Sequence, residues 1–424
     1  MRKINYNYDS LLEGWRGRAL EEDEYMEQNI EIREKNALQK SKEFIEELTV
    51  CSVVNCPASI VTNGNKFFSW DKEHRSKENG YPYLYSWSYY NGVIFEGLKY
   101  IYEKTGDPRY MTYIREFLDA MITNGSLNRY AGYVPYHGLD CYKTASLLAD
   151  FCRVNEEGYP NDDEYNKTAA GLYHDLVKEN ACYTEKDVGG NYWHTWYDKK
   201  APKYKVWLDG IYMAQPFIAR YASKIQDSEQ LALVYTRFHW VAENMLASNG
   251  LYYHAANSKD DVCDFFWLRA IGWHAMAQVD VMEYMPEKYL SNMKTDLKNF
   301  IDGILRFQDA SGMWKNLVDK PLTESNRLET SGTAMLIYCI LKAIRLGYID
   351  DADGNYIYAA KKSFCYMVEE KLSSNGLKDI YLMAAASGLN NYEKIEWYKK
   401  NEGKGIGPFI MAYAEMIKAC EGVK

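Results

Sequence analysis

Two carboxylates stand where aromatic-rich turns lead into apolar helical stretches. Asp209 lies in KVWLDGIYMAQPF and Asp140 lies in YVPYHGLDCYKTASLL. Aspartate is a favoured helix N-cap, so each residue also has a purely structural interpretation. If both helices begin at one cleft, the two carboxylates also face each other, and their repulsion raises the pKa of at least one. Such a pair holds a proton near neutral pH, as general acid catalysis requires.

Three of the seven histidines, His137, His194 and His254, fall in similar turns between helical stretches. A metal site would need closely spaced ligands, but the sequence has no HxH or HxxxH pair and the surroundings are aromatic. The pattern therefore favours hydrogen bonding to a substrate over metal coordination.

A single arginine stands in the segment DFFWLRAIGWHAMAQVDVM. Arg269 lies between Trp267 and Trp273, in an otherwise apolar helix start. A buried guanidinium needs a partner. One interpretation is a structural ion pair, for instance with Asp264. The other is a clamp for a substrate carboxylate, framed by the two indoles.

Aromatic residues are abundant, with 39 Tyr, 11 Trp and 14 Phe. Tyr and Trp combine a flat apolar face with a polar tip, which suits stacking on sugar rings, although most of them are expected to fill helix interfaces. Lys199 belongs to a basic run just before Trp207. This run is either a solvated loop or a contact for an acidic sugar.

A short pattern of small polar residues, a glycine and an aromatic or aliphatic cluster recurs about every 60 residues. It is found at Gly64, Gly132, Gly190, Gly250, Gly312 and Gly376. Helical periodicity fills the intervals at 91–104, 109–122, 208–224, 231–247, 265–283, 293–307, 329–346 and 356–372. The unit is a helical hairpin repeated six times. It fits an all-α (α/α)6 toroid better than an open solenoid, whose repeats are shorter.

We expect residues 1–50 to form an N-terminal helical arm and residues 51–424 a single (α/α)6-barrel catalytic domain. Lys and Arg total 50 against 59 Asp and Glu, a net charge of −9, which argues against a nucleic acid partner. No apolar run is long enough to span a membrane, and no signal peptide is evident. The nine cysteines show no CxxC spacing, which indicates reduced thiols. Reduced thiols are typical of a reducing compartment, so we predict a cytoplasmic protein. No pattern determines the oligomeric state.

Four strings resemble one family of enzymes: VWLDGIYMAQPF, FWLRAIGW followed by VDVM, ETSGTAMLIYCILKAIRLGYI and GKGIGPFIMAYAEM. They resemble the unsaturated rhamnogalacturonyl hydrolases of glycoside hydrolase family 105, relatives of the unsaturated glucuronyl hydrolases of family 88. The resemblance covers residues 87–416. It implies the (α/α)6 toroid and acidic oligosaccharide substrates whose terminal uronic acid carries a 4,5 double bond. It implies hydration: an aspartate protonates C4 and activates water to attack C5, and the resulting hemiketal opens. No metal or other cofactor is implied.

The resemblance also assigns residues. It makes Asp209 the acid and base and Asp140 the second catalytic carboxylate. The substrate-binding set that it implies, together with the turn residues above, is His254, Arg269, Trp273, Trp207, Tyr89, Tyr90, His137 and Lys199. The chain departs from the family pattern at Cys141, Lys143, Asp198 and the stretch after His254. These departures surround the sugar site, so they leave the exact uronide and its aglycone sugar open.

Two alternatives belong to other classes of function. An inverting glycosidase would use Asp140 and Asp209 as acid and base on saturated oligosaccharides, with room for water between them. A non-catalytic sugar-binding protein built on helical repeats would not depend on either carboxylate. Fold alone does not choose among these functions.

Overall fold

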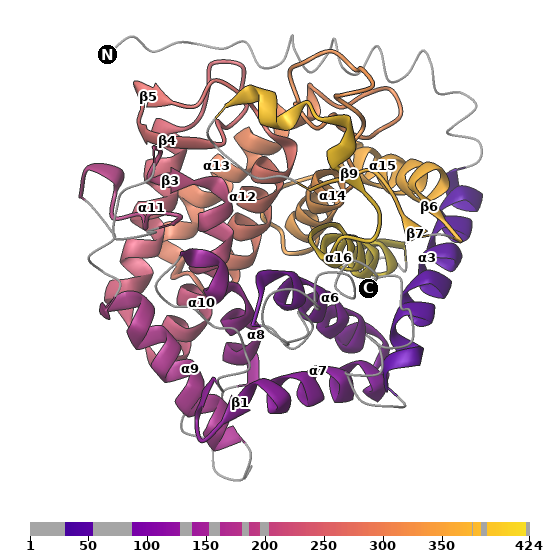
Figure 1. Ribbon diagram of the computed structural model, residues 1–424. Helices are drawn as coiled ribbons and strands as arrows, with labels where there is room; N and C mark the ends of the chain where they lie inside the picture. The colour runs from indigo at the N-terminus through magenta and orange to yellow at the C-terminus, as the bar shows by residue number, and fades with distance from the viewer. Residues whose placement is uncertain are drawn as a thin grey trace.

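The computed structural model describes residues 30–53, 87–127, 138–151, 162–179, 186–195, 203–374, 376–382 and 388–420. Within these residues an inner ring of six helices surrounds the axis of the molecule (Figure 1). Each inner helix packs against the next, and the last packs against the first, so the ring is closed. The ring consists of α6 (Tyr89–Thr105), α8 (Lys143–Phe151), α10 (Leu208–Ile225), α12 (Leu268–Val281), α14 (Thr330–Arg345) and α16 (Gly403–Cys420).

A second layer of helices lies outside this ring. It contains α7 (Pro108–Met121), α9 (Asp162–Val177), α11 (Ser228–Asn244), α13 (Glu287–Leu305), α15 (Asn355–Lys371) and α3 (Ile30–Val53). Helix α3 packs against α15, α7 and α16 and so occupies the outer position between the last hairpin and the first. The predicted (α/α)6 toroid is confirmed. The domain boundary at residue 50 stays a prediction.

Burial explains why the two layers differ in composition. Every residue of α12 is buried, because an inner helix contacts neighbours on all sides. In α13 the buried side chains recur at helical spacing, as in Met293, Leu297, Phe300 and Ile304, while the opposite face meets solvent. None of the helices in the described ranges is long and apolar enough to cross a membrane.

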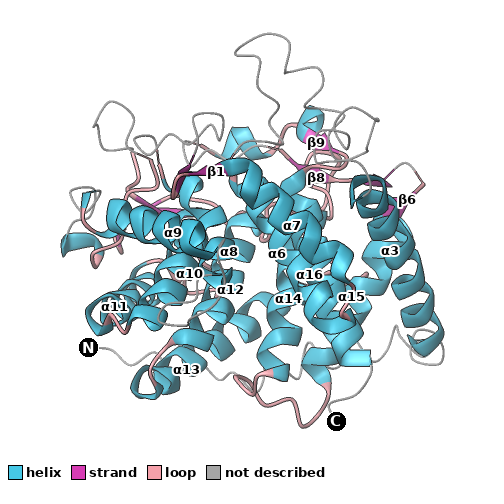
Figure 2. Ribbon diagram, turned by 90° about the horizontal axis from the view of Figure 1, so that it is seen from below, coloured by secondary structure: helices cyan, strands magenta, loops and turns pink. Residues whose placement is uncertain are grey.

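Short antiparallel strands follow the outer helices and lead the chain into the next inner helix. They form the pairs β1 (Ile122–Thr123) with β2 (Ser126–Leu127), β6 (Leu372–Ser373) with β7 (Gly376–Leu377), and β8 (Ile380–Tyr381) with β9 (Tyr398–Lys399), and the sheet of β3 (Val206–Trp207), β4 (Ala255–Ser258) and β5 (Asp261–Val262). Figure 2 shows β1, β6, β8 and β9 gathered toward one end of the helices.

The recurring glycines serve these turns. Gly250, Gly312 and Gly376 all have a positive φ, which favours glycine. The turn after α7 uses Gly125, with φ 70°, and it follows Asn124, which also has a positive φ. The occurrences at Gly64 and Gly132 lie outside the described residues.

A chain of buried charges crosses the interior of the ring. Glu96 of α6 contacts both Lys143 of α8 and Arg220 of α10. On the other side of the ring, Asp280 of α12 lies 2.7 Å from the ammonium of Lys342 of α14. The hydroxyls of Tyr100 and Tyr338 hydrogen-bond each other and connect the two groups. Opposite charges thus compensate one another where water is excluded.

Candidate active site

The amino ends of the inner helices meet at one end of the barrel. The ring of Tyr89 at the start of α6 packs edge-on against Trp273 of α12, with centroids 6.2 Å apart. Arg269 of α12 reaches Ser331 of α14, and the ammonium of Lys404 of α16 lies 4.9 Å from the centre of the Tyr90 ring. Side chains from the first turns of four inner helices therefore surround one region.

Strand pairing brings His254 to the start of α10. Trp207 of β3 pairs with Ala255 of β4, and the backbone N–H of Leu208 donates to the carbonyl of His254 at 3.0 Å. As a result, His254 Nε2 lies 2.8 Å from Asp209 Oδ2. The other ring nitrogen of His254, Nδ1, lies 3.2 Å from the hydroxyl of Tyr392. His254 and Tyr392 are fully buried and Asp209 is 5 % exposed.

Asp140 lies in the short helix η2 (Leu139–Tyr142), just before α8. The backbone N–H of Leu139 donates to the carbonyl of His194, and Asp140 Oδ1 lies 3.9 Å from His194 Nε2. A Cβ on Gly210 would lie 2.9 Å from Leu139 and 3.1 Å from His194. The glycine after Asp209 therefore lets α10 approach the segment that carries Asp140.

The two carboxylates have opposite pKa shifts. Burial alone raises the pKa of Asp209, but its interaction with His254, which includes their hydrogen bond, together with those with His194 and Arg269, outweighs burial and lowers that pKa. Burial raises the pKa of Asp140. His194 and Lys404 lower it and the neighbouring Asp209 raises it, and the net shift is upward. The Asp140 side chain is 52 % exposed, which limits the size of its shift. Asp140 thus favours the protonated form relative to Asp209.

Neither carboxylate caps its helix, although aspartate is a favoured cap. Trp207 occupies the N-cap of α10 and Gly138 that of η2, and no side-chain capping hydrogen bond is made at either position. Asp209 instead bonds to His254. The two carboxylates are therefore not engaged in holding the helix ends.

Arg269 is almost fully buried at the start of α12. Its Nη1 donates to the carbonyl of Tyr381, lies 3.4 Å from Ser331 Oγ and lies 3.9 Å from Glu329 Oε1. Its guanidinium also lies over the ring of Trp267, 4.3 Å from the centroid. The ion-pair partner is thus Glu329 rather than Asp264, because Glu329 begins α14 beside it.

The predicted aromatic residues lie at the same end but differ in exposure. Trp207 stacks on His194 with centroids 4.6 Å apart, and its ring remains partly exposed. Tyr89 and Tyr90 are also partly exposed and contact each other at 4.1 Å. Trp273 is 1 % exposed, since Tyr212 stacks on it at 4.9 Å and Tyr89 covers it. His137 and Lys199 lie outside the described residues.

Sequence reasoning did not single out Glu329, Tyr392 or Lys404 for this region. Lys404 is 4 % exposed, and its ammonium donates to the carbonyl of Leu382 at 3.0 Å. Among the described residues no carboxylate lies within 4.0 Å of this ammonium, although its charge lowers the pKa of the Asp140 carboxyl at the same end of the barrel. The sequence did contain a signal for Lys404, because this residue lies in GKGIGPFIMAYAEM, one of the four strings that resemble the family.

Two departures from the family pattern lie beneath this region. Lys143 is fully buried, binds Glu96 and lies 4.4 Å from the centre of the Tyr212 ring. The Cys141 thiol donates to the carbonyl of Gly138 at 3.1 Å. Both side chains therefore contact protein groups. Among the described residues no three His, Cys, Asp or Glu side chains form a group that could hold a metal ion. The absence of a cofactor stays a prediction.

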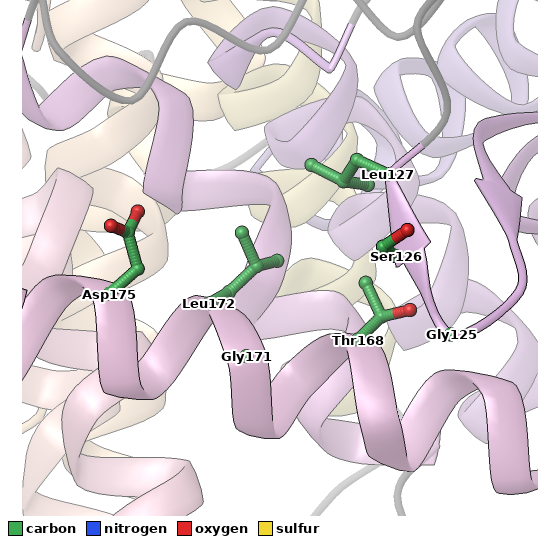
Figure 3. A pocket seen from close by; sticks show the side chains of 7 residues that line it. All are labelled: Gly125, Ser126, Leu127, Thr168, Gly171, Leu172 and Asp175. Carbon is green, nitrogen blue, oxygen red and sulfur yellow. The ribbon is translucent and has the colours of Figure 1, made fainter.

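A pocket of about 300 Å³ lies elsewhere, between the β1–β2 hairpin and the outer helix α9 (Figure 3). Its lining is Gly125, Ser126, Leu127, Thr168, Gly171, Leu172 and Asp175. None of the predicted site residues contributes to it. The pocket is mostly apolar and lacks paired carboxylates, so it does not replace the barrel end as the candidate active site.

Comparison with known proteins identifies the family of this chain. The model of Glycosyl Hydrolase Family 88 matches residues 65–420, and the chain belongs to this family. The unsaturated rhamnogalacturonyl hydrolase YesR of Bacillus subtilis is 22 % identical over 345 residues, covering 79 % of this chain and 90 % of YesR. Protein Atu3128 of Agrobacterium fabrum is 26 % identical over 229 residues, covering 48 % of this chain and 98 % of that protein.

Solved structures of related enzymes have the same fold as this chain. A family 105 glycoside hydrolase of C. acetobutylicum matches with a TM-score of 0.68 and 25 % identity, covering 78 % of this chain and 94 % of that one. The unsaturated glucuronyl hydrolase of Bacillus sp. GL1 has the same fold, with a TM-score of 0.58, 14 % identity and coverage of 78 % and 86 %. The predicted family resemblance and the predicted glycoside hydrolase class are confirmed.

Proposed function

We propose that this chain releases the terminal 4,5-unsaturated uronic acid of lyase-generated oligosaccharides by hydrating its double bond. Family membership and the named relatives confirm the expected reaction class, hydrolysis of oligosaccharides with an unsaturated uronic acid. The observation that supports this active site is the pair Asp140 and Asp209. Both carboxylates lie near Arg269 or Lys404 at one end of the barrel, and their pKa values are shifted in opposite directions.

The pKa directions support a division of labour between the carboxylates. The unsaturated uronate is an enol ether, so protonation at C4 leaves a cation at C5 that the ring oxygen stabilises. Asp140, with its raised pKa, suits the proton donor, and Asp209, with its lowered pKa, suits the base that takes a proton from the attacking water. The resemblance instead assigns both steps to Asp209, and variants of the two residues distinguish these assignments.

Cationic and aromatic side chains supply the binding surface in this proposal. Arg269 already has Glu329 at 3.9 Å, whereas Lys404 lacks a carboxylate within 4.0 Å among the described residues. We therefore assign the uronate carboxylate to Lys404 together with Arg269. Tyr89, Tyr90 and Trp207 are the partly exposed rings available to stack on sugars. His254 is fully buried, so it acts through Asp209.

A panel of pectic, ulvan and glycosaminoglycan disaccharides tests the proposal, each in its lyase-generated and its saturated form. Hydration removes the ultraviolet absorbance of the conjugated double bond and releases the aglycone sugar. Turnover restricted to unsaturated members supports the proposal. Cleavage of the saturated members at equal rates would instead identify an inverting glycosidase.

A further inference from the structure

Three buried groups form a continuous line of hydrogen bonds behind Asp209. The hydroxyl of Tyr392 lies 3.2 Å from His254 Nδ1, and His254 Nε2 lies 2.8 Å from Asp209 Oδ2. Tyr392 and His254 are fully buried, so water does not compete for these bonds. Tyr392 comes from η7 (Leu389–Tyr392), which is far from the other two residues in the chain.

A neutral imidazole carries one N–H donor and one acceptor nitrogen. An ionised Asp209 accepts only, so it requires the proton on Nε2, and Nδ1 must then accept from a donor. The phenolic hydroxyl of Tyr392 is that donor. We propose that Tyr392 is a positioning residue that holds His254 in the Nε2–H tautomer and so keeps Asp209 ionised and oriented. This inference rests on the proposed role of Asp209.

The surroundings fix Tyr392 independently of His254. Its carbonyl accepts the side-chain N–H of Asn316 at 2.9 Å, and Asn316 Oδ1 accepts the indole N–H of Trp267 at 3.0 Å. Its ring packs against Phe265 with centroids 4.6 Å apart. Trp267 also contacts this ring, with centroids 5.1 Å apart, so packing and hydrogen bonds hold the hydroxyl in place, as a positioning group requires.

Other titratable groups also face this line. They are Asp140 from η2, His194 from the segment before β3, Arg269 from α12 and Cys263 beside the backbone of His254. A Tyr392→Phe variant leaves all of these in place and removes only the hydroxyl. A change in the titration of Asp209 in that variant therefore reports on the Tyr392 hydroxyl.

Nitrogen NMR of the full-length protein labelled with ¹⁵N-histidine tests the tautomer without any substrate. The chain has seven histidines, and a His254→Gln variant identifies the signals of His254. We expect an unprotonated Nδ1 and a protonated Nε2 at neutral pH. A protonated Nδ1, alone or together with a protonated Nε2, would overturn the proposal whatever the substrate proves to be.

Kinetic measurements distinguish a positioning role of Tyr392 from a role in packing alone. In Tyr392→Phe we expect the acidic limb of the kcat/KM profile to move to higher pH, because Asp209 loses its oriented donor. We expect kcat to fall about threefold to tenfold, the effect of one hydrogen bond, with KM unchanged. Tyr398→Phe is the matched control, since within the described part of the chain its hydroxyl bonds the backbone of Arg327 and Ser325 and no side chain. An acidic limb that stays in place in Tyr392→Phe would make Tyr392 a packing residue.

Discussion

Asp209 and Asp140 differ in what surrounds them, and this difference is the main chemical feature at the residue scale. A buried histidine is hydrogen-bonded to Asp209, whereas the Asp140 side chain is half exposed and its Oδ1 lies 3.9 Å from Nε2 of His194. The same residue type therefore occupies two electrostatic environments. Environments that separate two pKa values are the usual way for one site to hold both an acid and a base.

Asp209→Asn removes the ionised carboxylate with almost no change in size. We expect turnover of an unsaturated disaccharide to fall by about 10²–10⁴, the usual contribution of a positioned acid or base, while the folded structure survives. Asp227→Asn is a control, because Asp227 caps the outer helix α11 and lies outside the catalytic group. Wild-type turnover in Asp209→Asn would remove this residue from the mechanism.

The pH dependence of kcat/KM follows from the two pKa directions. In the proposed mechanism Asp209 acts ionised and Asp140 acts protonated, so the profile should be bell-shaped. Its acidic limb, from Asp209, should lie below the usual aspartate range, and its alkaline limb, from Asp140, above that range. In Asp140→Asn the alkaline limb should disappear along with most of the activity. A profile that stays bell-shaped in this variant would reassign that limb.

Lys404→Gln tests the assignment of the uronate carboxylate. Glutamine retains a donor for the carbonyl of Leu382 but loses the charge, so we expect a higher KM for acidic substrates with a smaller change in kcat. The exposed Lys399 gives the matched control, Lys399→Gln, with wild-type kinetics. Equal KM values in Lys404→Gln and wild type would leave Arg269 as the carboxylate ligand.

At the scale of elements, helix ends were the most predictable features. The stretch TGDPRY ends α6 at Gly106, with φ 69°, and begins α7 with Asp107 as its N-cap and Pro108 in its first turn. Both features depend only on neighbouring residues. The left-handed backbone conformation after a helix favours glycine, and the N-cap position favours a side chain such as aspartate. Periodicity placed α10 and α14 almost correctly for the same reason.

Two glycines give opposite predictions for stability. A Cβ on Gly106 meets no atom within 4 Å, yet its φ of 69° disfavours alanine, so Gly106→Ala should lower the unfolding free energy by about 1–2 kcal/mol. Gly171 lies exposed within α9 with equally open space and no positive φ, so Gly171→Ala should raise it by about 0.5–1 kcal/mol. Chemical denaturation measures both, and changes of the same sign would contradict the argument.

At the scale of the whole molecule, closure of the ring depends on contacts between helices far apart in sequence. Helices α16 and α6 close the inner ring, and α3 fills the outer layer beside them. Charges inside the ring accompany this closure, since Glu96 joins α6 to both α8 and α10. Burial alone raises the pKa of Glu96, but Arg220 and Lys143 outweigh it and lower that pKa.

Glu96→Gln leaves two buried cations without their shared counter-ion. We expect a loss of about 3–5 kcal/mol in unfolding free energy, measured by denaturant titration at neutral pH. The stabilising effect of the Glu96 carboxylate should vanish as pH falls through its lowered pKa, because the folded state then binds the proton as well. Glu103→Gln on the same helix removes an exposed carboxylate, and its partner Lys99 keeps a second partner, Asp150, at 2.8 Å, so the loss should stay below about 1 kcal/mol. Similar losses in both variants would contradict this assignment.

The sequence by itself determined the helices, the turn glycines and the strings around Asp209, Arg269 and Lys404. These features depend on periodicity, capping and backbone conformation within a few residues of one another. Tertiary structure alone decided the partners. His254 is 45 positions from Asp209, and Tyr392 is 138 positions from His254. Because closure of the ring brings them together, no local pattern could show that a histidine binds Asp209 and lowers its pKa while the pKa of Asp140 is raised.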